Sequence, residues 1–288
     1  MSKVGFIGLG TMGYPMAGHI SKSFTTFVFN RTKTKSQKWM HQYKGTVCQS
    51  VADLSQRSDI IFLCLSRDCD VKEIICGNGG ILENVKPGSI IVDHSTTSKD
   101  LTLNMKERLQ DHKCFYLDAP VSGGEVGAQQ ATLSIMVGGE KNSYKKITPI
   151  LDCYSNFHKY MGVSGNGQLT KMINQICIAG LIQALAEAVN FAKKSGVPPK
   201  EVLEVISKGA AQSWQMENRW ESMVDNEYDF GFAVDLMVKD LEIISEFSKR
   251  IGADISLTET IKTYYNELQE MGAGSLDTSS LLRRLDRS

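Results

Sequence analysis

Three glycines near the N-terminus are spaced to bind the pyrophosphate of a dinucleotide. The apolar segment 3–7 is followed at once by Gly8-Leu-Gly-Thr-Met-Gly13, and residues 15–20 have helical spacing. A G-x-G-x-x-G segment between a strand and a helix gives a tight turn, room for the pyrophosphate and close helix–strand packing, although such turns also serve as purely structural crossings. The N–H groups of the following helix favour the phosphate charge. Cofactor contacts are expected from Gly8, Leu9, Gly10, Thr11, Met12 and Gly13.

The residues after the second predicted strand bear on which dinucleotide binds. An NAD-selective fold places Asp or Glu there to accept hydrogen bonds from the ribose 2′-OH. Here the chain has Asn30, and Arg31, Thr32 and Lys35 can hold a 2′-phosphate through charge and a hydroxyl. The pattern predicts NADP in preference to NAD, with dual use of both cofactors as the alternative if Arg31 is only solvated.

Strands and helices alternate in the first half of the chain. The expected strands are 3–7, 26–30, 60–65, 89–93, 114–118 and 132–138. Helical segments such as 34–42 and 99–111 lie between them. The continuous apolar runs 60–65 and 90–92 are typical of strands covered on both faces. The pattern predicts an α/β Rossmann-type N-terminal domain with a mainly parallel sheet.

The character of the sequence changes near Gly162. From Gln168 to Ser195 there is no Pro and a single Gly, and apolar residues recur at helical spacing over a length of about 42 Å. Later segments are also helical in pattern. We expect domains at 1–162 and 163–288, the second all-α and joined by a long interdomain helix at about 168–195. This helix is apolar on much of its circumference, which indicates burial in a core or in a homodimer or homotetramer.

The composition is typical of a globular protein and gives no sign of a nucleic-acid or membrane partner. The chain has 288 residues, 42% hydrophobic and 22% charged, with a formal net charge of zero. The neutral balance and the lack of a basic tail disfavour nucleic acid, and apolar stretches such as 176–185 are too short and interrupted to be expected to span a membrane. The first residues lack a basic region followed by an apolar run, so no signal peptide is expected. The seven cysteines form no C-x-x-C pair and no Cys/His cluster with zinc spacing, so no metal site is expected. Their odd number favours reduced thiols in the cytoplasm.

Four segments together resemble the β-hydroxyacid dehydrogenase family over essentially the whole chain. They are 5–13, 118–124 with 133–139, 165–175, and 239–241. Their order matches the family's dinucleotide turn, substrate loop, catalytic helix and distal cofactor contact. The resemblance implies NAD(P)-dependent interconversion of a small β-hydroxyacid and its semialdehyde or keto form. Members include 3-hydroxyisobutyrate dehydrogenases, tartronate semialdehyde reductases and glyoxylate/succinic semialdehyde reductases.

The resemblance assigns the general acid/base role to Lys171, early on the long helix and expected to face the interdomain cleft. Asn174 and Gln175 follow three and four residues later, so they share a helix face with Lys171 and can bind the substrate oxygen. This Asn-Gln pair occurs in the tartronate semialdehyde reductases, whereas many other members have two asparagines. Without the motif, Lys171 would be interpreted as a solvated surface charge.

The resemblance also assigns the remaining contacts. The loop of Ser122, Gly123 and Gly124 is expected to bind the substrate carboxylate, with an ordinary turn as the alternative. Further cofactor contacts are expected after the carboxyl ends of strands and from the helical domain, at Leu65, Ser66, Thr96 and Lys239. Three aromatic residues either line the substrate pocket or pack in the core, namely Trp214, Phe230 and Phe232.

Two other functions are alternatives. Imine reductases share the architecture but generally lack a lysine at the position of Lys171. A non-catalytic dehydrogenase-like interaction module would also have that lysine replaced, whereas this chain keeps it. The lysine therefore favours the dehydrogenase.

Overall fold

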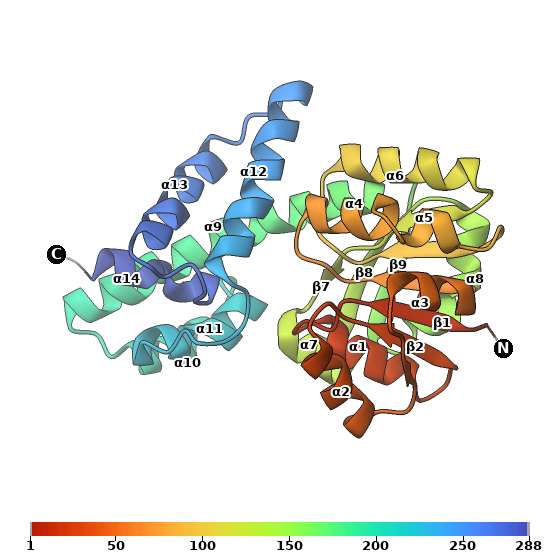
Figure 1. Ribbon diagram of the computed structural model, residues 1–288. Coiled ribbons are helices and arrows are strands. Elements are labelled where there is room, and N and C mark those ends of the chain that lie inside the picture. The colour runs from red at the N-terminus through yellow and green to blue at the C-terminus, as the bar shows by residue number, and fades with distance from the viewer. Residues whose placement is uncertain (1, 287–288) are drawn as a thin grey trace. The chain divides into compact units, whose positions relative to one another are not determined.

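The computed structural model describes residues 2–286 of the chain. The chain divides into two compact units, with the division between Lys171 and Met172. The first unit combines a sheet with helices, and the second is helical (Figure 1). The boundary predicted at Gly162 coincides with the end of the last strand, β9 (Ser155–Gly162). The residues that follow it, up to Lys171, pack with the sheet unit.

Nine strands of the described residues form one sheet, in the order β3-β2-β1-β4-β5-β6-β8-β7 with β9 beside β8. Their bounds are β1 Val4–Ile7, β2 Thr26–Phe29, β3 Thr46–Val47, β4 Ile60–Leu63, β5 Ile90–Asp93, β6 Phe115–Asp118, β7 Val121–Ser122 and β8 Leu133–Gly138. Strands β1 to β6 pair in parallel. Strand β8 is antiparallel to β6 and β7 and parallel to β9. The sheet is therefore mainly parallel, as predicted.

Helices cover both faces of this sheet. They are α1 Gly13–Ile20, α2 Lys33–Gln42, α3 Val51–Arg57, α4 Asp68–Cys76, α5 Ile81–Asn84, α6 Lys99–Asp111, α7 Gly124–Gln130 and α8 Lys141–Leu151. Alternate residues of one strand point to opposite faces, so Ile61 packs in the cluster with α3, α4, α5 and α6, and Phe62 in the cluster with α1, α2, α7 and α8. Helices thus lie over both faces of the sheet (Figure 1), and the burial of its residues on both faces explains the continuous apolar runs.

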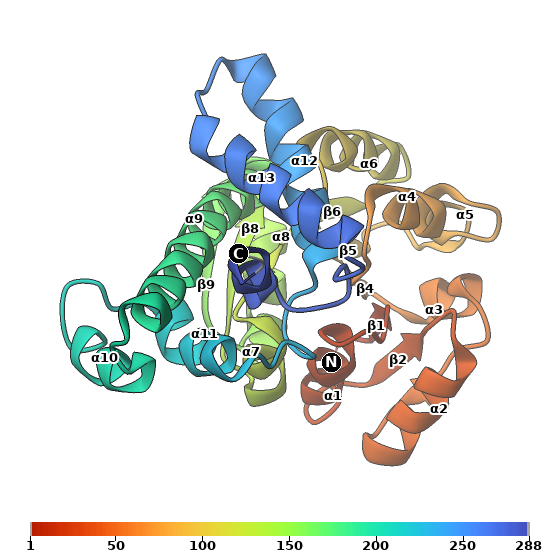
Figure 2. The same cartoon turned by 90° about the vertical axis from the view of Figure 1, so that its left-hand side faces the viewer.

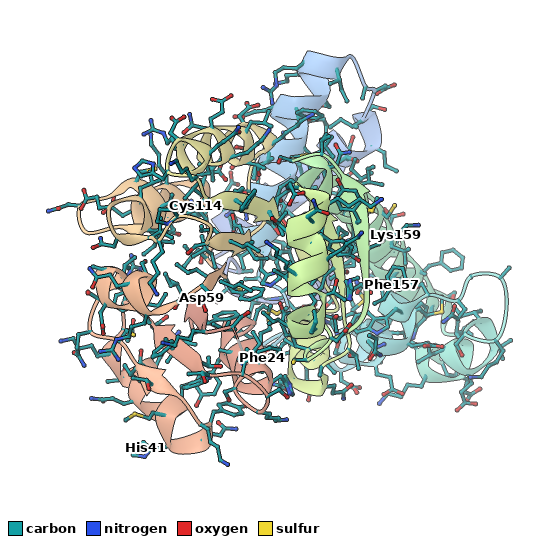
Figure 3. All side chains as sticks on the ribbon, turned by 90° about the vertical axis from the view of Figure 1, so that its right-hand side faces the viewer. Phe24, His41, Asp59, Cys114, Phe157 and Lys159 are labelled. Carbon is teal, nitrogen blue, oxygen red and sulfur yellow. The ribbon has the colours of Figure 1, made fainter. Side chains whose placement is uncertain are left out.

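Six of these strands were predicted from the sequence, and β3, β7 and β9 were not. Strands β3 and β7 are two residues long. Strand β9 is longer, but its residues are mostly exposed or half-buried, and Phe157 and Lys159 lie on its exposed side (Figure 3). A strand at the sheet edge without a buried apolar run lacks the signal by which the other strands were recognised.

The second unit is built from helices. After the long helix α9 (Asn166–Ser195) come α10 Pro199–Ile206, α11 Trp214–Asp225, α12 Val234–Ile251, α13 Ser256–Glu270, the 3-10 turn η1 Thr278–Leu281 and α14 Leu282–Leu285. Helices α12 and α13 pack side by side (Figure 2). The prediction of an α/β Rossmann-type domain followed by an all-α domain, with a long connecting helix, is confirmed.

Helix α9 is more apolar than was expected from the length of its uninterrupted apolar runs. Among the described residues it is the one helix long and apolar enough to cross a membrane, with an 18-residue window of mean hydropathy 1.5. The expectation that the apolar stretches of the chain are too short and too interrupted to span a membrane was wrong by this criterion, because it rested on uninterrupted runs such as 176–185. Length and composition alone are weak evidence, since core helices of soluble proteins meet the same criterion. In α9, 44% of the window is buried inside the structure.

Candidate active site

The glycine turn after β1 is fixed by close contacts between backbone segments. Gly8 has φ +100°, and a Cβ there would lie 2.2 Å from the carbonyl oxygen of Cys64. A Cβ on Gly13 would lie 2.0 Å from the carbonyl oxygen of Gly8. At Gly10, by contrast, an added Cβ would meet no atom within 4 Å. The turn therefore requires two of its glycines for its own packing, while the third presents open backbone, as the approach of a pyrophosphate demands.

Asn30 fastens this turn to the end of β2. Its side-chain oxygen accepts a hydrogen bond from the N–H of Leu9 at 2.8 Å, and its amide nitrogen donates to the carbonyl of Thr32 at 3.1 Å. The residue thus shapes the turn itself. Arg31 and Lys35 beside it are exposed. Both cationic groups are accessible to an anionic ligand.

The loops that follow β4 and β5 are joined by a buried polar network. The hydroxyl oxygen of Ser95 accepts a hydrogen bond from the N–H of Leu65 at 2.9 Å. Asp93 accepts from the N–H of Ser95 at 2.9 Å and from the hydroxyl of Tyr116 at 2.7 Å. The two predicted cofactor-contact segments, 65–66 and 96, therefore lie on neighbouring loops at the carboxyl ends of adjacent parallel strands. In open α/β sheets ligands bind at this edge.

Asp93 and the next residue along the chain, His94, have opposite pKa shifts. Burial raises the pKa of the Asp93 carboxyl to about 6, even though hydrogen bonds from Ser95 and Tyr116 oppose the shift. Burial lowers the pKa of the His94 imidazole to about 4. Asp93 thus stabilises the fold at low pH and loses this contribution as the pH rises through about 6. His94 contributes stability above its ordinary pKa and loses it as the pH falls through about 4.

The raised pKa of Asp93 predicts a pH-dependent stability difference between the wild type and an Asp93→Asn variant. Between pH 4 and pH 6 the wild type loses the contribution of Asp93, whereas the variant has no such group. The free energy of unfolding of the variant, relative to the wild type, should therefore rise by up to about 3 kcal/mol across this range. Urea unfolding at several pH values measures the difference. A difference that stays constant with pH would contradict the assigned shift.

Asp118 at the end of β6 fixes the start of α9. Its carboxylate oxygens accept hydrogen bonds from the N–H groups of Gly165 and Gln168, each at 2.9 Å. The carboxylate is fully buried, and burial raises its pKa while these N–H bonds oppose the rise. A Cβ on Gly167 would lie 2.8 Å from a carboxylate oxygen, so this approach requires glycine. The beginning of α9 is thus bound to the sheet unit.

Lys171 lies one turn after this anchor. Its side chain is buried, with 8% of the residue exposed. The interpretation as an ordinary solvated charge therefore does not hold, because exposed lysines keep their head group in water.

The predicted carboxylate loop follows the short strand β7. Ser122 pairs with Ser134 of β8. Gly123 and Gly124 have φ +127° and +61°, and a Cβ on Gly124 would meet no atom within 4 Å. All three loop residues, 122–124, are half-buried. The loop presents backbone that a small ligand can approach.

The predicted residues of the second unit form a chain of polar contacts. Asn174 donates to the side-chain oxygen of Gln175 at 2.8 Å, and Gln175 donates to Asp240 at 2.7 Å. Asp240 also pairs with the ammonium of Lys239 at 2.9 Å. Gln175 uses both polar atoms within the protein, so in this conformation it orients Asn174 and Asp240. Asp240 lies within the segment 239–241 that resembles the family, but no role for it was predicted from the sequence.

The aromatic residues Trp214 and Phe230 both contact the side chain of Arg219. The guanidinium of Arg219 lies 5.2 Å from the ring centre of Trp214 and 5.0 Å from that of Phe230. Arg219 also pairs with the buried Asp277 at 3.1 Å. Asp277 accepts a hydrogen bond from the N–H of Phe232 at 2.8 Å, which fixes the 230–232 segment. Trp214 and Phe230 are exposed and hence not core residues.

Comparisons with known proteins identify the chain's relatives. Residues 3–172 match the NAD-binding domain of 6-phosphogluconate dehydrogenase, and residues 165–285 match the NAD-binding region of NADP-dependent 3-hydroxyisobutyrate dehydrogenase. An uncharacterised oxidoreductase of Shewanella frigidimarina is 45% identical, with 100% of this chain and 99% of that protein covered. The 2-hydroxy-3-oxopropionate reductase of Escherichia coli is 32% identical, with 99% and 97% covered.

A solved structure agrees with these matches. The 3-hydroxyisobutyrate dehydrogenase of Mycobacterium tuberculosis, determined with L-serine, has a TM-score of 0.88 and 26% identity over 100% of both chains. The match extends through the sheet unit and the helical unit alike. The resemblance noted in the sequence is therefore confirmed: the chain belongs to the β-hydroxyacid dehydrogenase family and is an NAD(P)-dependent oxidoreductase.

Proposed function

We propose that the protein interconverts a small β-hydroxyacid and its semialdehyde or keto form, in the manner of a 3-hydroxyisobutyrate dehydrogenase. The observation that carries this proposal is the burial of Lys171, 8% exposed, on a turn anchored to Asp118 in the same unit as the glycine turn. The relatives reported above are named for small carboxylates with a neighbouring hydroxyl or carbonyl group.

The chemistry assigned to each residue follows from its contacts. The bound nicotinamide supplies a hydride in reduction and accepts one in oxidation. Lys171 gives a proton to the substrate carbonyl oxygen in reduction and takes the hydroxyl proton in oxidation. Ser122, Gly123 and Gly124 hold the carboxylate, and Asn174, oriented by Gln175, holds the reacting oxygen. Together these contacts fix the substrate in the geometry that the transfer needs.

The residues present fit a dinucleotide. The open backbone at Gly10 accommodates the pyrophosphate, while Gly8 and Gly13 keep the turn tight. The remaining proposed contacts are Leu9, Thr11, Met12, Thr32, Leu65, Ser66, Thr96 and Lys239. A panel of semialdehydes and hydroxyacids, assayed with both cofactors by nicotinamide absorbance, tests the proposal. Absence of turnover across glyoxylate, succinic semialdehyde, tartronate semialdehyde, 3-hydroxyisobutyrate and serine would refute it.

We further propose a preference for NADP. An Arg31→Ala variant should bind NADPH about 10- to 100-fold more weakly, because a charge-assisted bond to the 2′-phosphate is lost, while NADH binding should change little. Fluorescence titration with each cofactor measures both constants. Lys38→Ala is the control, since Lys38 is exposed one turn beyond Lys35 on α2. If wild-type protein binds NADH more tightly than NADPH, the preference is wrong.

We also propose a cytoplasmic homodimer or homotetramer that forms through the helical unit. Helix α9 exposes apolar side chains, with Ile173 62% and Phe191 74% accessible. Burying such a face against a second copy removes apolar area from water. Light scattering should give a mass of two or four chains, and Phe191→Glu should shift the distribution towards monomer. A monodisperse wild-type monomer would contradict this.

All seven cysteines are free in the described part of the chain, in keeping with a reducing compartment.

A further inference from the structure

Gln168 connects the first turns of α9 to the loop that follows β5. Its side chain is fully buried. Its amide nitrogen donates a hydrogen bond to the carbonyl oxygen of Ser95 at 2.8 Å, and its amide oxygen accepts one from the N–H of Thr97 at 3.1 Å. A single amide group therefore holds the backbone on both sides of Thr96. Only a side chain with both a donor and an acceptor can make this pair of contacts.

The main chain of Gln168 is held as firmly as its side chain. Its N–H donates to Asp118, the carboxylate that also binds Gly165. Lys171 follows three residues later on the same helix, where side chains lie on neighbouring parts of one face. The position of Lys171 relative to β6 and to the 95–97 loop is thus fixed by the same residue.

The network continues to the neighbouring loop. Ser95, whose carbonyl accepts from Gln168, also accepts the N–H of Leu65 with its hydroxyl oxygen at 2.9 Å. Both loops that carry proposed cofactor contacts are therefore linked to the helix that carries Lys171. Such a link matters because a displacement of about 1 Å between reacting groups can cost about 100-fold in rate.

We propose that Gln168 is a positioning residue that holds Lys171 at a fixed position relative to the backbone at 65–66 and 95–97. This inference depends on the proposed function, in which Lys171 transfers a proton and Thr96 contacts the cofactor. An apolar side chain at this position leaves the carbonyl of Ser95 and the N–H of Thr97 unpaired in a buried site, so the loop and the helix turn separate or rotate to find new partners.

Three variants test this role. Gln168→Met keeps the length of the side chain and removes both hydrogen bonds. Gln168→Glu keeps the acceptor for Thr97 but, when ionised, sets an oxygen against the Ser95 carbonyl; the protonated acid restores a donor. Asn166→Ala is the control, because Asn166 lies on the same turn of α9 and donates a comparable bond, at 2.8 Å, to Met161, away from the cofactor loops.

The expected results distinguish an effect of Gln168 on the position of Lys171 from a general loss of protein stability. For Gln168→Met, kcat with the best substrate of the panel and NADPH should fall about 10- to 100-fold, while the NADPH dissociation constant changes less than about threefold. In the cofactor-free protein, amide hydrogen exchange at Thr97 should accelerate. The kcat of Gln168→Glu, divided by that of the wild type, should rise as the pH falls from 8 to 5.5, whereas the ratio for Gln168→Met should stay flat. Asn166→Ala should change none of these quantities.

Other outcomes overturn the inference. They are a kcat of Gln168→Met within twofold of the wild type, an equal loss in Asn166→Ala, unchanged exchange at Thr97, or a pH-independent ratio for Gln168→Glu. A Lys171→Met variant measured in parallel tests the role of Lys171 separately from the role of Gln168. If that variant keeps wild-type turnover, the proposed proton transfer by Lys171 fails; if it is inactive while Gln168→Met resembles the wild type, only the role of Gln168 fails.

Discussion

A Lys171→Met variant should lose about 10²- to 10⁴-fold in kcat, the range that a positioned general acid or base supplies. Methionine has a similar length and an apolar end, so it fits a buried position without a proton to transfer. The NADPH dissociation constant should stay within about threefold, because the proposed cofactor contacts lie elsewhere. Steady-state kinetics with the best substrate of the panel and fluorescence titration of NADPH give both quantities.

The control for this loss is Lys193→Met, at the exposed far end of the same helix. It removes an equal charge from α9 and should leave kcat within about twofold, as surface substitutions usually do. A folded Lys171→Met protein that keeps wild-type turnover would exclude Lys171 as the proton donor. A loss of NADPH binding as large as the loss in kcat would instead indicate a cofactor contact.

The second large effect is expected at the glycine turn, where two substitutions should separate folding from binding. In Gly13→Ala the new methyl group lies 2.0 Å from the carbonyl oxygen of Gly8 and 2.9 Å from the Phe6 ring. Backbone must move, so we expect a loss of about 1–3 kcal/mol or more in the free energy of unfolding and at least about 100-fold in NADPH affinity.

Gly10→Ala is the matched variant. Its methyl group meets no protein atom within 4 Å, so stability should stay within about 0.5 kcal/mol of the wild type. NADPH affinity should still fall at least about 10-fold, because the methyl group occupies the space that the pyrophosphate needs. Thermal or urea unfolding and cofactor titration of both variants measure the two effects. Unchanged NADPH affinity in Gly10→Ala would place the pyrophosphate elsewhere.

Some elements of this fold could be predicted because their signals are local. The apolar runs of β4 and β5 gave their positions, and the helix predicted at 168–195 begins at Asn166 in the structure. Strand β9 escaped prediction because it is an edge strand whose exposed residues, among them Phe157, carry no buried pattern. The expectation that α9 is not apolar enough to span a membrane was wrong because it rested on the length of an uninterrupted apolar run. The mean hydropathy over 18 residues of α9 meets the criterion although polar residues interrupt that run.

The candidate site likewise has features that could be predicted from the sequence and contacts that could not. The glycine turn and the order of the family's segments were recognisable in the sequence, and the family membership they indicated is confirmed. Asp118 belonged to a recognised segment, but its role in holding Gly165 and Gln168 could not be seen there. Nor could the contacts of Gln175 with Asp240 or the position of Arg219 between two aromatic rings.

The sequence by itself determined the strand–turn–helix at Gly8–Gly13, most strands of the sheet and the long helix, because steric demands and hydrophobic periodicity act between residues close along the chain. Only the tertiary structure decided which polar groups meet. Gln168 binds Ser95, 73 residues away, and Asp118, 50 residues away, and Lys171 is buried rather than solvated. No local pattern encodes such pairs, since they form only after the sheet and the start of α9 have packed and excluded the water that would otherwise bind these groups.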